Sequence, residues 1–251
     1  MNNDLRQIWL SEEQASFSGW DFKRLESRWA EAPLSWDYKE IVMQYLRPEQ
    51  QLLDLGTGGG EFLLTLGHPY HLTSVTESWE PNYRLCKRKL EPLGITVKRP
   101  DSEDRLPYED DTFDIVISRH ESYDLSEVKR VLRPGGMFIT QQVGGSNDEA
   151  LSQLLLEDYN PQFPEFTLTN EQKAIHNHGF DILLAAEEYP YLRFFDIGAI
   201  VYFAKIVPWE FPGFSVERCY PKLCELQDRL EKDEYIECLA HRFLIVAKQS
   251  L

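Results

Sequence analysis

The feature that most constrains the fold is an alternation of short apolar runs with helical segments across residues 37–143 of the 251-residue chain. The apolar runs predict strands at residues 51–55, 73–76, 96–99, 113–118 and 137–143. Strands that alternate with helices in this rhythm form βαβ units, whose right-handed crossovers place helices on both faces of a parallel sheet. The sequence therefore predicts a doubly wound α/β fold.

The last hundred residues add two strands, at 181–188 and 241–247, which brings the predicted sheet to seven. About fifty residues between them exceed what a hairpin needs, so residues 190–235 are interpreted as an insertion. Within it, residues 197–207 are apolar nearly all round and fit a buried helix or a buried strand equally well, and 216–233 form an amphipathic helix.

Residues 1–36 hold four of the six tryptophans, Trp9, Trp20, Trp29 and Trp36, with helical pieces around 4–14 and 22–29. Exposed tryptophans would create an aggregation-prone patch, so this segment must pack against the rest of the chain. We interpret residues 1–36 as an N-terminal cap and 37–251 as the main domain. Whether the cap and the insertion only cover the core, or also close a lid over a ligand, is left open at this point.

The charge balance narrows the class of protein. The chain has 42 acidic and 26 basic residues, a net charge of −16, which disfavours nucleic acid as a partner. No run approaches the ~18 apolar residues of a membrane span, and the first residues lack the pattern of a signal peptide. We therefore expect a cytoplasmic protein. The four cysteines form no Cys-x-x-Cys pair, so no metal site is predicted.

A glycine-rich turn, Asp54-x-Gly56-x-Gly58-x-Gly60, lies where the first strand should meet the next helix. Glycines allow positive φ and close approach of the backbone to a ligand. A dinucleotide fingerprint would need a third glycine at position 61, where Glu61 stands and would repel a pyrophosphate. A P-loop lysine is also missing, so the turn favours a nucleoside without phosphates.

Residues 52–61 resemble the first motif of class I S-adenosylmethionine-dependent methyltransferases, in the methyltransferase type 11 or UbiE-like group. Glu77, residues 100–107, 113–116 and 131–136 are similar to the later motifs of that family, in the same order. The resemblance covers residues 50–143 well. It implies a seven-stranded, mostly parallel sheet whose last strand is antiparallel, with S-adenosylmethionine as the cofactor.

The resemblance also implies the cofactor site. Asp54 would lie near the methionine ammonium, Glu77 would accept from the ribose hydroxyls, and Asp101 would lie at the adenine amino group with Ser102 beside it. The full set of residues implied is Asp54, Gly56, Thr57, Gly58, Gly60, Glu77, Ser78, Asp101, Ser102 and Ser118.

Transfer from a sulfonium is a direct displacement, so the protein has chiefly to align the acceptor and exclude water. His120, just after the fourth strand, is the candidate general base, because its ordinary pKa lies near neutrality. A packing role for His120 fits the sequence equally well. Glu121 and Tyr123 are weaker candidates, and Gln141 and Gln142 are candidate amide contacts to a polar substrate.

Three functions are compatible with these residues. The first is methyl transfer to a nitrogen or oxygen atom of a small molecule. The second is methylation of a ribosomal or transfer RNA base, as in guanine-N1 enzymes. Those enzymes carry an N-terminal zinc module, but no cysteine precedes Cys86 here. The third is a non-catalytic protein that binds S-adenosylmethionine. The methyl acceptor and the oligomeric state are not determined by the sequence.

Overall fold

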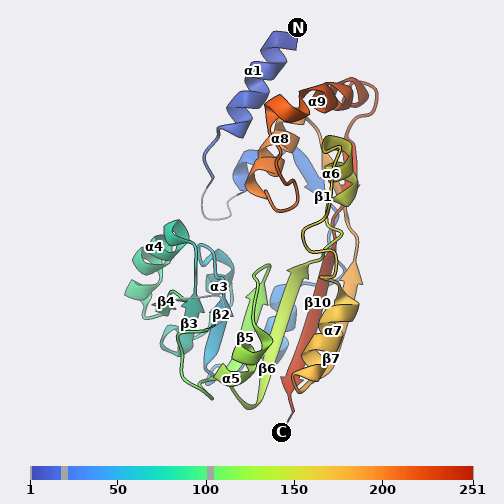
Figure 1. Ribbon diagram of the computed structural model, residues 1–251. Helices are drawn as coiled ribbons and strands as arrows, with labels where there is room; N and C mark the ends of the chain where they lie inside the picture. Colours follow the sequence, from blue (N-terminus) through green and yellow to red (C-terminus); the bar gives the residue numbers. More distant parts are fainter. Residues whose placement is uncertain (1, 18–21, 101–104, 251) are drawn as a thin grey trace.

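The core of the molecule is a seven-stranded sheet, seen in the computed structural model, which describes residues 2–17, 22–100 and 105–250 (Figure 1). In spatial order its strands are β4 (Thr96–Lys98), β3 (Thr73–Thr76), β2 (Leu52–Leu55), β5 (Phe113–Arg119), β6 (Leu132–Val143), β10 (Arg242–Gln249) and β7 (Phe180–Glu188). β10 is antiparallel to both of its neighbours, whereas the pairs from β4 to β6 are parallel. The predicted class I sheet is confirmed.

Helices cover both faces of this sheet, and alternate residues of each strand point to opposite faces. Leu52 packs with the helices α2 (Tyr38–Tyr45), α3 (Glu61–Thr65) and α4 (Glu80–Lys89). Leu53 packs on the other face with α5 (Leu125–Val131) and α7 (Leu168–Asn177). Short 3-10 turns, η2 (Tyr70–Leu72) and η3 (Glu91–Leu93), complete this part of the chain.

Side-chain caps fix where several of these helices begin. Asp37 accepts a hydrogen bond from the backbone N–H of Glu40 at the start of α2, and Asp124 accepts from Glu127 at the start of α5. A short polar side chain at the N-cap satisfies an amide that has no partner inside the helix. The α2 cap matters for the site because α2 follows directly on Trp36 and carries Tyr38.

A second lobe stands over the carboxyl ends of the parallel strands (Figure 1). It has a three-stranded antiparallel sheet of β1 (Trp29–Glu31), β8 (Tyr191–Phe194) and β9 (Ile236–Leu239). Its helical segments are α1 (Asn2–Glu13), η1 (Phe22–Leu25), α6 (Glu149–Leu155), α8 (Ile197–Ile206) and α9 (Val216–Leu230). A single apolar cluster joins the N-terminal segment to the inserted residues, so these two parts of the sequence share one core.

The structure differs from the prediction between residues 22 and 29. The predicted helix is replaced by the short η1 turn and by strand β1, in which Trp29 pairs with Phe194. The pairing partner lies far along the chain, so local helical spacing gave no sign of it. Within residues 197–207, for which helix and strand were both open, the structure forms the helix α8, in which every residue but Lys205 is buried.

Across the described part of the chain, no helix combines the length and the apolar character that crossing a membrane requires.

Candidate functional site

The glycine turn between β2 and α3 has the backbone that its composition predicts. Gly56, Gly58 and Gly60 have φ angles of 60°, 63° and 75°, the left-handed region that other residues rarely adopt. A Cβ at Gly56 would lie 2.3 Å from the Cγ of Glu121, so the Glu121 side chain would have to move to admit it.

Asp54 lies near the end of β2, just before this turn, and only 3% of its surface is exposed. Burial raises the pKa of Asp54 to about 7, because a carboxylate loses its hydration there. The guanidinium of Arg119 acts in the opposite direction, and Glu77 adds to the rise. Asp54 is therefore a buried carboxyl that a cation would ionise.

Glu77 follows β3 and is buried beside the turn. Its carboxylate accepts hydrogen bonds from the backbone N–H groups of Gly58, at 2.9 Å, and of Trp79, at 2.8 Å. Burial raises the pKa of Glu77, and these backbone bonds partly oppose the rise. The carboxylate thus ties the glycine turn to the end of the neighbouring strand.

Ser118, at the end of β5, is fully buried, and its hydroxyl donates to the carbonyl of Glu121 at 3.1 Å. The Tyr38 hydroxyl lies 3.0 Å from the carbonyl oxygens of both Ser118 and Ile139. These contacts fix the loop that leads from β5 into the site. The Ser118 side chain therefore stabilises the loop through its hydrogen bond to Glu121.

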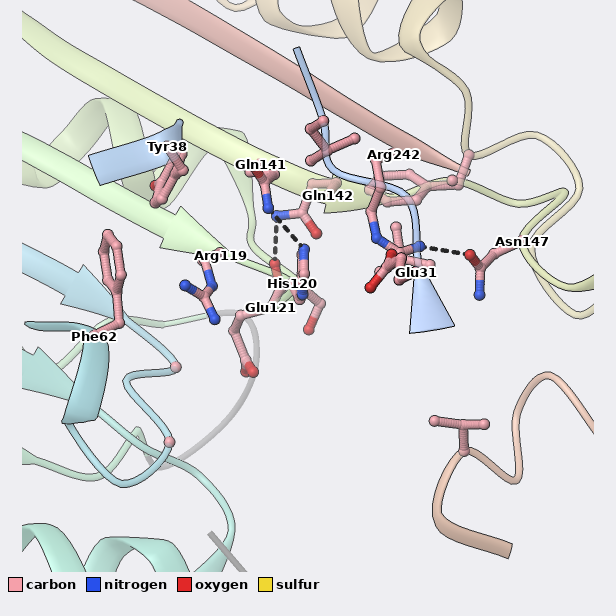
Figure 2. A pocket seen from close by; sticks show the side chains of 18 of the residues that line it. Glu31, Tyr38, Phe62, Arg119, His120, Glu121, Gln141, Gln142, Asn147 and Arg242 are labelled. Carbon is pink, nitrogen blue, oxygen red and sulfur yellow. Dashed lines mark hydrogen bonds and ion pairs between the residues drawn. The ribbon is translucent and has the colours of Figure 1, made fainter. Parts of the chain in front are cut away.

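His120 lies in that loop with a φ of 59°. This left-handed conformation is unfavourable in free energy for any residue that has a Cβ. Its backbone N–H donates to the carbonyl of Gln141 at 2.8 Å, and its Nε2 lies 3.1 Å from the Gln141 amide nitrogen (Figure 2). The side chain faces the cavity. Surrounding protein atoms, Arg242 and Arg119 hold the pKa of His120 well below its ordinary value.

The glycine turn, Asp54 and His120 line one cavity of about 2230 Å³ between the carboxyl edge of the sheet and the second lobe. Pockets for single small ligands are roughly 300–1,000 Å³, so this space exceeds one ligand. Of the residues predicted for the site, Asp54, Gly56, Thr57, Gly58 and His120 line the cavity. Gly60, Glu77, Ser78 and Ser118 are placed next to these residues in the chain or through hydrogen bonds, but do not line it. Asp101 and Ser102 lie outside the described residues.

The second lobe contributes the more apolar side of the cavity. The apolar side chains there are Phe22, Trp29, Leu192, Phe203, Val207 and Trp209. A polar junction closes the same side, where Arg242 of β10 forms an ion pair with Glu31 of β1 at 3.0 Å. The cavity therefore combines a polar floor with an apolar roof.

Sequence reasoning did not single out several residues that line this cavity, among them Arg119, Trp36 and Arg242. Arg119 forms no ion pair with a described residue, and its guanidinium lies 4.8 Å from the ring centre of Phe62. Its position directly after the fourth predicted strand was the available signal. For Trp36 and Arg242 the sequence carried no such signal, because these residues reach the site from opposite ends of the chain. Figure 2 shows Arg119, His120 and Arg242 around the same space.

The described side chains were compared with the donor groups that a metal ion requires. Within the portion of the chain that the structure describes, no group of three or more His, Cys, Asp or Glu side chains is arranged to hold a metal ion.

Comparison of the sequence with known proteins finds a matching family model and several similar proteins. A family model described as a methyltransferase domain matches residues 53–140. A phthiotriol/phenolphthiotriol dimycocerosates methyltransferase of Mycobacterium ulcerans is 35% identical over 100 residues, 37% of this chain and 36% of that protein. The Mycobacterium tuberculosis protein of that name is 34% identical over 111 residues, 40% of each chain. The chain thus spans well under half the length of these relatives.

Comparison of the structure extends the similarity beyond the matched residues. A putative methyltransferase of Bacillus halodurans superposes with a TM-score of 0.56 and covers 86% of this chain and 99% of its own. At 15% sequence identity, this similarity concerns the fold.

Proposed function

We propose that this chain, whose residues 53–140 match a methyltransferase-domain model, is a class I S-adenosylmethionine-dependent methyltransferase that methylates a nitrogen or oxygen atom of a small molecule. The observation that carries the proposal is the buried Asp54 beneath a left-handed glycine turn, at the floor of a cavity with room for two ligands.

The residues at the glycine turn fit S-adenosylmethionine. The turn is a cradle that a Cβ at Gly56 would fill, and it presents backbone to the cavity. Asp54 supplies a carboxyl that an ammonium group would ionise, and no lysine or arginine pairs with it within ion-pair distance among the described residues. Such a buried acid suits a cationic ligand without phosphates.

We assign the holding of the ribose hydroxyls to Glu77. Its carboxylate already orders the glycine turn through the bond to Gly58 and lies at the end of the strand beside that turn. Asp101 and Ser102 are assigned to the adenine. Ser78 and Ser118 are proposed to flank the cofactor, together with Thr57 and Gly60.

When bound, the cofactor supplies an electrophilic methyl group on a positively charged sulfur. The protein's part is to align the acceptor and to exclude water. We propose that His120 contacts the acceptor, because its side chain faces the cavity beside the end of β5. The second lobe, which comprises the N-terminal segment and the insertion, is proposed to act as a lid.

The shape of the cavity favours an acceptor with an apolar part. Its volume of about 2230 Å³ leaves space beside a nucleoside, and its roof carries aromatic and aliphatic side chains. The mycobacterial relatives are named for phthiotriol and phenolphthiotriol dimycocerosates as acceptors. We therefore propose a small, partly apolar acceptor. RNA has less support as the acceptor, because the acidic side chains of the cavity lining, which include Glu31, Glu61 and Glu121, outnumber its basic ones, Lys23, Lys39, Arg119 and Arg242.

Thermal unfolding with S-adenosylhomocysteine tests the cofactor assignment. A ligand at 100 times its dissociation constant stabilises by about 2.7 kcal/mol. For a chain of this size, that corresponds to a rise in Tm of roughly 5–10 °C. Glu77→Gln is expected to lose most of the rise, whereas the exposed Glu234→Gln keeps it. No rise in the wild type would refute the cofactor site, and a full rise in Glu77→Gln would refute only the ribose assignment.

A further inference from the structure

We propose that His120 is held as a fixed hydrogen-bond donor, with its proton on Nδ1, that binds an oxygen atom of the acceptor, and that Trp36 and Gln141 are the positioning residues that fix it. The part that concerns the acceptor rests on the proposed methyl transfer. The part that concerns the tautomer depends only on the free protein.

The first step is the orientation of the Gln141 amide. Its Oε1 lies 2.8 Å from the indole Nε1 of Trp36. An indole N–H can only donate, so the atom that faces it must be the amide oxygen. The Gln141 nitrogen is therefore turned toward His120, as Figure 2 shows.

The second step is the protonation of the imidazole. The Gln141 amide nitrogen, which can only donate, lies 3.1 Å from His120 Nε2. Nε2 must therefore be the acceptor and carry no proton. The cationic side chains of Arg119 and Arg242 lie close enough to disfavour the imidazolium. A neutral ring with a bare Nε2 carries its proton on Nδ1.

The third step is the direction in which Nδ1 donates. The described residues provide no hydrogen-bond partner for Nδ1, and the His120 side chain lines the cavity. The left-handed backbone of His120 and its bond to the Gln141 carbonyl hold the ring in this place. A single fixed donor therefore faces the space proposed for the acceptor.

This arrangement has a consequence for the reaction. The only lone pair of the neutral ring is engaged by Gln141, so His120 has no free site at which to remove a proton. It can instead donate to a carbonyl, carboxylate or hydroxyl oxygen and hold that group in line with the methyl donor. We infer that the acceptor presents such an oxygen at or beside the atom that is methylated.

Nitrogen-15 NMR of the full chain, labelled at histidine, tests the tautomer directly. Two-bond proton–nitrogen correlations at pH 7.5 are expected to show a protonated Nδ1 and an unprotonated Nε2 for His120, identified by the loss of its signals in His120→Asn. Trp36→Phe, which removes the indole donor, is expected to give a mixture of tautomers. A protonated Nε2 in the wild type would overturn the proposal, and an unchanged tautomer in Trp36→Phe would overturn the role of Trp36.

Activity variants test the role of the donor, with a panel of alcohols, carboxylic acids and amines as acceptors and release of S-adenosylhomocysteine as the readout. Asparagine tolerates left-handed backbone and places an N–H near the Nδ1 position. His120→Asn is expected to keep kcat/KM within about tenfold of the wild type. His120→Asp, of the same shape but without a donor, is expected to fall much further. Equal losses of roughly 100-fold or more in both variants would instead identify a general base.

The two levels of the proposal fail separately. If no compound on the panel is methylated, the proposed function fails for those acceptors, but the tautomer is still decided by NMR. If the tautomer is wrong, methyl transfer can still be observed and the donor role of His120 is lost.

Discussion

At the scale of single residues, the site contains buried carboxyl groups whose ionised form is unfavourable unless a cation binds beside them. Asp54 shows this most clearly, since burial raises its pKa to about 7 from an ordinary 3.8. The folded chain therefore binds this proton more tightly than the unfolded chain. The stabilising contribution of the protonated carboxyl is complete below about pH 4 and is lost as the pH rises through about 7.

Asp54→Asn should therefore stabilise the free protein at pH 8. The substitution removes a penalty on the order of 2–4 kcal/mol, which corresponds to a rise in Tm of roughly 5–10 °C. The advantage of Asp54→Asn should shrink toward pH 5, where the wild-type carboxyl is protonated in the folded state. Thermal unfolding from pH 5 to pH 8 measures both effects. A wild type more stable than the variant at pH 8 would contradict the cost assigned to Asp54.

At the scale of elements, the central sheet could be predicted from the sequence because its signals are local. Each strand is a short apolar run, and the Asp54-to-Gly60 turn carries its conformational requirement in its composition. Glu77 was predicted because the family resemblance places an acid at the end of the second strand. Its bond to Gly58 could not be predicted, because it depends on how β2 and β3 lie side by side.

Substitution of two glycines with similar backbone conformations distinguishes the effect of backbone strain from the effect of a side-chain clash. Gly56 and Gly67 have φ angles of 60° and 62°, but a Cβ meets Glu121 only at Gly56 and has nothing within 4 Å at Gly67. Gly67→Ala should lower the free energy of unfolding by about 1 kcal/mol. Gly56→Ala should lower it further and abolish the thermal shift with S-adenosylhomocysteine.

Denaturant unfolding of the two variants provides the comparison. Equal losses of stability, with the ligand response intact in both, would show that the space beside Gly56 is not needed.

At the scale of the whole molecule, the second lobe is the part that the sequence revealed least. Its tryptophans indicated a cap, and the spacing of the last two strands indicated an insertion. That both segments share one core follows from contacts such as Trp29 with Phe194, whose residues lie far apart in the sequence. The helix predicted over 22–29 was wrong for the same reason, since β1 exists only through its pairing with β8.

The junction of the two lobes depends on one arginine. Arg242 pairs with Glu31 and also donates to Asn147, which in turn donates to Asp148 and Glu210. Burial raises the pKa of Asp148, Glu210 and Glu31, and the charge of Arg242 opposes each rise. Loss of that charge leaves buried acids without compensation.

Arg242→Met should therefore destabilise the protein by roughly 2–4 kcal/mol at pH 8, and by less at pH 5, where more of these carboxyls are protonated. Arg229→Met is the matched control, because Arg229 pairs with Asp233 on the exposed surface at the end of α9, and its loss should cost under about 0.5 kcal/mol. Equilibrium denaturation at both pH values measures the difference. Equal effects of the two substitutions would exclude the junction as a source of stability.

The central claim is that the floor of the cavity binds a cationic, phosphate-free nucleoside through Asp54. Isothermal titration of the protein with S-adenosylhomocysteine at pH 6, in two buffers with different ionisation enthalpies, tests it most directly. Asp54 is largely protonated at that pH, so binding of the ligand's ammonium group should release about one proton in the wild type and none in Asp54→Asn. Absence of binding, or the same proton release in both proteins, would contradict the account.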